Sequence, residues 1–255
     1  MNCRLCSSPI ATSFADAKLL RREVQYFDCP NCGYVQTEEP TWLEEAYATS
    51  INSSDTGIMA RNLSNVGLVL ATLSLMGERN GQVVDYAGGN GFLVRLLRDK
   101  GVNAFWADPY SENLVARGFE YSGGKTNLIT AFEAFEHFVK PLEEMRQLLS
   151  ISSNILLTTN IIPRPAPQPS DWWYYGLDHG QHIGFYRVKT LEYLAEKFGL
   201  HLLTDGLSTH LLSKKKYSGL IFFTLKKFAK LFPNLFSIGL GSKSTKDHLC
   251  LRGKI

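Results

Sequence analysis

The sequence lacks a strong excess of charge of either sign. Among its 255 residues, 27 Lys and Arg stand against 24 Asp and Glu, which gives a formal net charge of +3 at pH 7. An excess this small does not by itself indicate a nucleic acid or an anionic membrane as the partner. Hydrophobic residues make up 44% of the chain and charged residues 20%, which is enough apolar material for a sizeable core and excludes a disordered chain.

Long apolar runs are also missing. The longest nearly apolar stretch, residues 66–76, is well short of the roughly 20 residues that a membrane-spanning helix needs. The opening Met-Asn-Cys-Arg-Leu-Cys is not the apolar region of a secretory signal. We therefore expect a cytoplasmic protein with one domain of ordinary size and a smaller module.

Cysteine is scarce, but four of the five cysteines form two closely spaced pairs. Cys3 and Cys6 make one C-x-x-C pair, and Cys29 and Cys32 make the other. Two such turns bring four thiolates together, which completes a tetrahedral zinc shell and leaves no position for a substrate. We predict a structural zinc site in a module over residues 1–45. Two redox pairs or a disulfide framework are the alternatives.

Beyond residue 41, strands and helices alternate, which predicts a parallel sheet covered by helices over residues 46–255. Thr41 and Glu44 have the spacing of a capping box. Cys250 stands between two leucines and is expected in the core. Hydrophobic spacing predicts helices over 41–47, 58–77, 91–100, 141–149, 188–198 and 214–235, and strands over 82–86, 102–106, 127–132, 155–162, 200–207 and, last, 247–251.

A glycine-rich turn follows the first of these strands. The segment Val-Asp-Tyr-Ala-Gly-Gly-Asn-Gly reads acidic-x-small-x-Gly-x-Gly, with Asp85, Ala87, Gly89 and Gly91 in the defined positions. The Gly-Lys-Ser/Thr of a P-loop and the spacing of a dinucleotide fingerprint are both missing. Asp108 ends the next strand, 17 residues beyond Gly91. A carboxylate there can accept two hydrogen bonds from a vicinal diol.

These residues resemble the first motif of the class I S-adenosylmethionine-dependent methyltransferases. The resemblance implies a Rossmann-like, seven-stranded α/β fold, with S-adenosylmethionine over the loop and its ribose on Asp108. Ala87 stands where this family usually has its first glycine. The pair Glu136-His137, with a proline four residues later, resembles the turn after the family's fourth strand. Arg61 is a candidate partner of the cofactor carboxylate, with an ordinary surface arginine as the alternative.

The segment over residues 171–186 is dense in Trp, Tyr and His. We expect His137 to be the general base, because imidazole takes up a proton near neutral pH, with Glu136 beside it. Tyr174, His179 and His182 are expected to orient the acceptor, and aromatic faces suit sugar rings or bases. The alternatives are a satisfied core histidine and an aromatic core plug.

The stretch Asp-His-Gly-Gln-His-x-x-Phe-Tyr within this segment resembles zinc-ribbon methyltransferases of bacterial polysaccharide and deoxysugar biosynthesis. This resemblance implies a small-molecule or glycan acceptor of the sugar type, methylated at oxygen or carbon.

Two other classes of function remain open. One is an RNA methyltransferase whose zinc module binds nucleic acid. Nucleic acid is the weaker expectation, because the lysines concentrate in 214–230 and are interleaved with Phe. The other is a cofactor-binding scaffold without turnover. The basic, apolar helix over 214–235 is either an ordinary packed helix or an interfacial one that brings a cytoplasmic enzyme to a membrane surface. The sequence does not indicate an oligomeric state.

Overall fold

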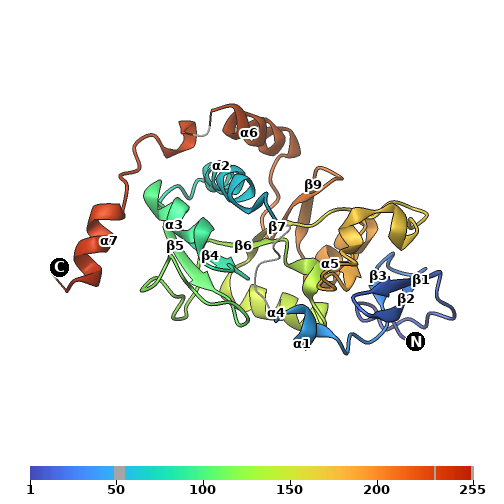
Figure 1. Cartoon of the computed structure of the whole chain (residues 1–255). Coiled ribbons are helices and arrows are strands. Elements are labelled where there is room, and N and C mark those ends of the chain that lie inside the picture. Colours follow the sequence, from blue (N-terminus) through green and yellow to red (C-terminus); the bar gives the residue numbers. More distant parts are fainter. Residues whose placement is uncertain (49–54, 233, 254–255) are drawn as a thin grey trace. The chain divides into compact units, whose positions relative to one another are not determined.

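The computed structural model of the chain describes residues 1–48, 55–232 and 234–253 (Figure 1). It divides into two compact units, each made of three segments. Unit 1 comprises Met1–Asn52, Phe132–Gln147 and Leu157–Lys214, and unit 2 comprises Ser53–Ala131, Leu148–Leu156 and Lys215–Ile255. The expected domain boundary at residue 45 stays a prediction. Residues 49–54 of the loop expected over 49–57 lie outside the described residues.

Unit 2 contains the first strands of the parallel sheet. β4 (Gln82–Tyr86) pairs in parallel with β5 (Asn103–Ala107) on one side and with β6 (Leu128–Phe132) on the other. Four of the five residues of β4 and of β6 are buried, as in parallel strands that helices cover on both faces. An isolated parallel bridge joins Trp106 to Glu120 and so extends the pairing beyond β5.

The long helix of unit 2 is α2 (Ile58–Met76), which ends at Gly77 because that glycine adopts a left-handed conformation with φ of 75°. It packs against α3 (Phe92–Asp99) and α6 (Gly219–Leu231), as Figure 1 shows. By length and composition alone α2 would also suffice to cross a membrane, which the sequence analysis did not expect. In this structure, 44% of the apolar window of α2 is buried.

The strand expected over 247–251 is wrong. These residues belong to a helix, α7 (Ser244–Leu251), and Cys250 is exposed rather than part of the core. Asp247 explains the placement of α7, because its buried carboxylate lies 2.6 Å from Nη2 of Arg98 on α3. The alternation Asp-His-Leu-Cys-Leu imitates a strand, and the buried ion pair is a tertiary contact that such a pattern does not reveal.

The sheet order is β5-β4-β6-β7-β10-β9, and both β6 and β7 (Asn154–Thr158) pass from one unit into the other. In unit 1, β10 (Thr209–Ser213) is antiparallel to β9 (His201–Thr204). The last strand is therefore β10, and it precedes α6 instead of following it. The remaining helices of this α/β arrangement are α4 (Pro141–Ile151) and α5 (Val188–Phe198), close to their expected positions.

A second, antiparallel sheet lies in unit 1. Its order is β1-β2-β3-β8, from β1 (Ala15–Leu19), β2 (Arg22–Asp28), β3 (Val35–Thr37) and β8 (Gly184–Phe185). The N-terminal strands thus pair with a strand from the aromatic segment 171–186. Bidentate hydrogen bonds of 2.7 Å each between Arg187 and Asp28 join the same two regions of the chain. β8 therefore completes a four-stranded sheet built from two distant parts of the chain.

The short helix α1 (Leu43–Ala46) confirms the helix expected near residue 41. The expected capping box is wrong, because the N-cap position is Trp42 and no side chain caps it. The Trp42 ring is buried, and its Nε1–H donates to the Gly180 carbonyl at 2.8 Å. Tertiary packing of this ring, rather than local capping, therefore positions α1.

Candidate functional site

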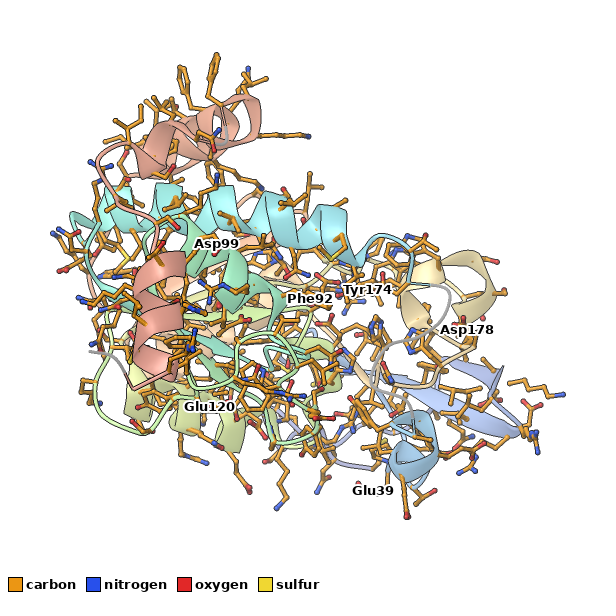
Figure 2. All side chains as sticks on the ribbon, turned by 60° about the vertical axis from the view of Figure 1, so that its left-hand side comes forward. Glu39, Phe92, Asp99, Glu120, Tyr174 and Asp178 are labelled. Carbon is orange, nitrogen blue, oxygen red and sulfur yellow. The ribbon has the colours of Figure 1, made fainter. Side chains whose placement is uncertain are left out.

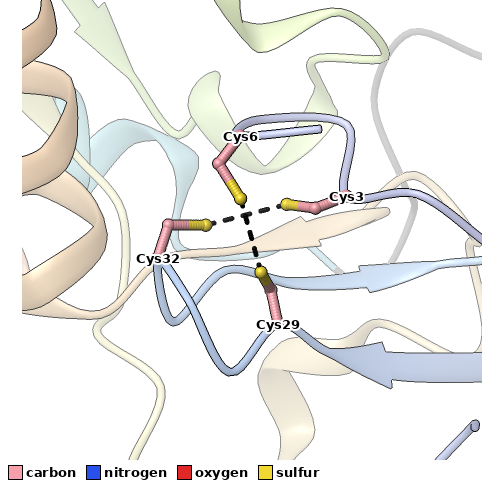
Figure 3. A group of neighbouring side chains, drawn as sticks. All are labelled: Cys3, Cys6, Cys29 and Cys32. Carbon is pink, nitrogen blue, oxygen red and sulfur yellow. Dashed lines mark hydrogen bonds between the residues drawn. The ribbon is translucent and has the colours of Figure 1, made fainter. Parts of the chain in front are cut away.

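Four cysteine sulfurs converge at one end of unit 1 (Figure 3). The Sγ atoms of Cys3 and Cys32 are 3.6 Å apart, and those of Cys6 and Cys29 are 3.5 Å apart. All four cysteines are free of disulfides. A tetrahedron with zinc–sulfur bonds of about 2.3 Å has edges of about 3.8 Å. The four sulfurs are therefore close to the separation that a zinc ion needs.

In unit 2, the glycine loop between β4 and α3 is shaped for close approach. A Cβ atom on Gly88 would lie 2.9 Å from Oδ2 of Asp85, so this position accepts only glycine without a shift. A Cβ atom on Gly89 would meet no atom within 4 Å, so the loop has open space there. Gly91 starts α3 with φ of 89°, a left-handed value that favours glycine. This loop has the open backbone that a ligand requires.

Ala87 has φ of 58°, a left-handed backbone conformation that costs an L-residue about 1–2 kcal/mol. Ala87 stands where a glycine is usual in the family that the loop resembles, and its left-handed backbone explains that usual choice. The neighbouring Asp85 is buried, and its Oδ1 accepts a hydrogen bond of 2.6 Å from the Thr130 hydroxyl. Burial, helped by the charge of Asp108, raises the pKa of Asp85 to about 7.

Asp108 lies at the end of β5 and fixes the loop. Its Oδ2 accepts from the Gly89 N–H at 2.9 Å, and its Oδ1 accepts from the N–H groups of Tyr110 and Ser111 at 2.8 and 2.9 Å. Each carboxylate oxygen can accept about two hydrogen bonds, so Oδ2 keeps the capacity for one more. Arg61, the other candidate in unit 2, pairs with Asp55, with Nη2 2.6 Å from Oδ2.

The third group of predicted residues begins in unit 1, where β6 ends. Glu133 follows β6 with φ of 48°, an uncommon conformation for this residue type that is typical of functional sites. The turn continues into a 3-10 helix, Phe135–His137. Nδ1 of His137 lies 2.7 Å from the hydroxyl of Tyr47. Tyr47 thus contacts the candidate base, although no sequence motif pointed to it.

Tyr174 connects the two carboxyl groups of this turn. Its hydroxyl lies 2.5 Å from Oε1 of Glu136, 3.2 Å from Oε2 of Glu133 and 3.4 Å from the hydroxyl of Thr159. Tyr174 and Glu136 are both buried, and Oε2 of Glu136 has no hydrogen-bond partner among the described residues. A buried carboxyl group with an unsatisfied oxygen is expected to carry a proton.

The pKa values of the two neighbours Glu136 and His137 are shifted in opposite directions by the same cause. Burial raises the pKa of Glu136 to about 8, and the charge of Glu133 adds to this shift. Burial also lowers the pKa of His137 well below 6.5, assisted by His182 and His179. Since burial disfavours either charged form, both groups are neutral at pH 7. The pair therefore consists of a protonated acid and a neutral imidazole, and the lowered pKa makes that imidazole a weaker base than a free histidine.

His182 and His179 meet in a turn, and their ring centroids are 4.8 Å apart. Nδ1 of His182 lies 2.6 Å from the Tyr174 carbonyl, so this nitrogen carries the proton and Nε2 is an acceptor. Nδ1 of His179 accepts from the Gln181 N–H at 3.1 Å, so its Nε2 carries the proton. Gly176 makes room for His179, because a Cβ atom there would lie 2.3 Å from the ring.

The aromatic residues expected to stack on a ligand are mostly buried. Tyr174 and Tyr175 are part of a hydrophobic cluster with Trp42, and Trp172 packs against it. Trp173 is the exception, with 78% of its surface exposed. The segment therefore serves as the core between the antiparallel sheet and the histidine turn, and this core holds the polar groups in place.

The structure gathers the predicted residues into three groups. The four cysteines form one; Asp85, Ala87, Gly89, Gly91 and Asp108 form the second; Glu136, His137, Tyr174, His179 and His182 form the third. Sequence reasoning missed Tyr47, Glu133 and Thr159. Glu133 alone gave a signal, since it stands at the end of a predicted strand three residues before the Glu-His pair.

A family model described as a methyltransferase domain matches residues 57–205, which is more than half of the chain. The chain belongs to this methyltransferase family. It is an S-adenosylmethionine-dependent methyltransferase with a mixed α/β fold, as the glycine loop led us to expect. No curated protein matches the sequence.

Several solved methyltransferase structures resemble this one. Magnesium protoporphyrin IX methyltransferase from Synechocystis PCC 6803, solved with bound S-adenosylmethionine, is 18% identical, with 68% of this chain and 90% of that chain covered and a TM-score of 0.41. An O-methyltransferase family protein from Burkholderia thailandensis is 14% identical, with coverages of 69% and 68% and a TM-score of 0.45. The bifunctional kinase-methyltransferase WbdD is 16% identical, with coverages of 69% and 42% and a TM-score of 0.39.

Proposed function

We propose that this methyltransferase transfers a methyl group to a sugar-type acceptor, with His137 as the general base. The position of His137 carries the proposal, because its Nδ1 lies 2.7 Å from the Tyr47 hydroxyl and its ring lies 5.0 Å from that of His182. At neutral pH the carboxyl group already holds a proton, so the imidazole is the group that can accept one. The acceptor is a hydroxyl or a carbon acid that must lose a proton when it is methylated.

Tyr47 contacts Nδ1 of His137 and so holds the imidazole ring in place. When Nδ1–H donates to the Tyr47 oxygen across 2.7 Å, Nε2 presents its lone pair to the acceptor. Once Nε2 takes up the proton, the hydrogen bond from Nδ1 becomes charge-assisted and therefore stronger. Tyr47 is thus a positioning residue that orients the ring and stabilises the imidazolium.

The two other histidines favour a hydroxyl-bearing acceptor. His182 offers an acceptor nitrogen and His179 a donor N–H, as their backbone hydrogen bonds require. A hydroxyl group both donates and accepts, so it can satisfy this pair. Glu133 and Tyr174 add further oxygen partners of the kind that bind polyols. We infer that these groups orient a sugar ring.

We assign the cofactor to the glycine loop of unit 2. S-adenosylmethionine supplies the methyl group when bound. Gly89 leaves the open space, and the free acceptor capacity of Asp108 Oδ2 suits a ribose hydroxyl. Arg61 would bind the cofactor carboxylate after its ion pair with Asp55 opens. Asp85 supports the loop from within the core.

We also propose that the four cysteines bind a structural zinc ion. Their sulfur separations fit a tetrahedral ion, and four thiolates fill its shell. The ion would hold the ends of the N-terminal segment, whose antiparallel sheet packs on the aromatic core next to the histidines. Its contribution to catalysis is therefore indirect.

The test is an acceptor panel assayed for S-adenosylhomocysteine release. The panel contains free sugars, nucleotide-linked sugars, lipid-linked glycans and bulk RNA. We expect turnover with a sugar-bearing acceptor and its loss in His137→Gln, with cofactor binding retained. Methylation of RNA instead, with the steep salt dependence of phosphate contacts, would establish the alternative function. Tight cofactor binding without turnover on any acceptor would favour a scaffold.

A further inference from the structure

Helix α6 has two apolar sides, which an ordinary packed helix does not have. One side faces α2: Phe222 and Ala229 are buried, and the Ala229 carbonyl comes within 3.2 Å of where a Cβ atom on Gly67 would stand. A helix packed on a protein normally turns polar residues outward on the other side. Here the outward side is largely leucine, isoleucine and phenylalanine.

The exposed apolar side is formed by five residues of α6 and its end. Leu220 is 81% exposed and Leu231 is 62% exposed. At 100° per residue, the five positions fall within about 120° of the helix circumference. Figure 2 shows side chains projecting from α6 on the side away from α2. The apolar surface consists of Leu220, Ile221, Phe228, Leu231 and Phe232.

The charge of the surrounding segment is of one sign. Residues 206–246 contain eight lysines and neither Asp nor Glu, whereas the whole chain has a net charge of only +3. Lys226, Lys227 and Lys230 lie on α6 along one border of the apolar surface, and Lys215 and Lys216 precede the helix. A helix with an apolar face bordered by lysines has the composition of helices that lie in a membrane interface.

We propose that the apolar surface of α6 docks on an anionic lipid membrane. Lysine stems can lie along the apolar region while their ammonium groups reach the lipid headgroups. A second copy of this chain fits less well, because it would bring two lysine-rich segments of the same charge together. An RNA partner fits less well because three of the five residues of this face are aliphatic and offer no stacking surface. The proposal does not depend on the acceptor.

Co-sedimentation of the full chain with vesicles tests the docking. Vesicles of phosphatidylcholine mixed with phosphatidylglycerol are compared with vesicles of phosphatidylcholine alone and with no vesicles. We expect the protein to pellet with the anionic vesicles, and high salt to weaken the binding. Failure to pellet with anionic vesicles would overturn the proposal.

Substitutions on the apolar surface of α6, compared with similar ones elsewhere on unit 2, test whether this surface contacts the lipid. We expect Leu231→Gln to weaken binding roughly tenfold, because it removes a large apolar group from the lipid-facing side. Lys227→Glu should weaken binding to anionic vesicles about fivefold or more. Leu114→Gln, at a leucine that is 46% exposed on another loop of unit 2, and Lys125→Glu should bind as the wild type does.

Two further outcomes would refute the assignment. If Leu231→Gln pellets like the wild type, the surface is not the lipid contact. If light scattering shows a concentration-dependent dimer that Leu231→Gln abolishes, with no vesicle binding, the surface joins two copies instead. All variants replace exposed residues, and unchanged circular dichroism melts confirm that each remains folded.

Discussion

Replacing Asp108 with asparagine should weaken cofactor binding without unfolding the protein. The carboxylate accepts three backbone hydrogen bonds, from Gly89, Tyr110 and Ser111. An asparagine oxygen can keep the Tyr110 and Ser111 bonds at the Oδ1 position. Its amide nitrogen then faces the Gly89 N–H, so two donors oppose each other in the loop that we assign to the cofactor.

The size of the effect follows from the lost bond. A hydrogen bond to a charged group contributes about 1.5–3 kcal/mol. Asp108 is partly exposed, so water compensates for part of the free energy of the lost hydrogen bond. The lower end of the range therefore applies. A change of about 1.4 kcal/mol is a factor of ten in affinity. We therefore expect roughly tenfold weaker binding for Asp108→Asn, and at least another tenfold for Asp108→Ala, which loses all three bonds.

Calorimetric titration with S-adenosylhomocysteine measures these affinities. Glu112→Gln is the matched control, because Glu112 lies in the same loop and its carboxylate pairs with exposed Arg117 instead of bonding the glycine turn. We expect Glu112→Gln to bind as the wild type does. Wild-type affinity in Asp108→Asn, within a factor of three, would refute the assignment of Asp108 as the loop's anchor.

Four further predictions concern the other groups. Ala87→Gly should stabilise the fold by about 0.5–1 kcal/mol in urea unfolding, because relief of the left-handed strain exceeds the entropy cost of glycine; a loss of stability would contradict the strain. Tyr47→Phe should lower kcat roughly 10- to 100-fold with little change in KM, since it removes the partner of His137 Nδ1; an unchanged kcat would remove its positioning role. Native mass spectrometry should show one zinc ion per wild-type chain, and Cys29→Ser should lose it and have a lower Tm; zinc-free wild-type protein would refute the site. Activity should fall above about pH 8 as Glu136 ionises, and Glu136→Gln should remove that decline; a decline that persists in the variant would exclude Glu136 as its cause.

The carboxyl group of Glu136 should also make the stability of the protein fall as the pH rises. The pKa of Glu136 is raised in the folded state, so the folded protein holds a proton that the unfolded chain releases above about pH 4.5. Its contribution to the free energy of unfolding therefore falls as pH rises from about 4.5 to 8. Denaturant titrations at several pH values should show Glu136→Gln gaining stability relative to the wild type over this window. A constant difference would contradict the raised pKa.

Local patterns in the sequence were enough to place most of the sheet and its glycine loop. β4 and α5 have the expected bounds, and α2 ends at the expected Gly77, because apolar periodicity and glycine act within a few residues. Likewise, the two C-x-x-C pairs carry their own ligand geometry. The C-terminal segment misled the same reasoning, because the burial of Asp247 against Arg98 is a contact across 149 residues.

The sequence by itself determined which chemical groups are present: the four thiolates, the glycine loop, and the Glu-His pair with its two later histidines. Only the tertiary structure decided their states. Burial gives Glu136 and His137 opposite shifts of pKa, and backbone carbonyl and N–H groups set which nitrogen of His182 and His179 carries the proton. Tyr47 reaches His137 across 90 residues. Desolvation and long-range hydrogen bonds depend on the enclosed surroundings of a group, and a linear pattern does not record them.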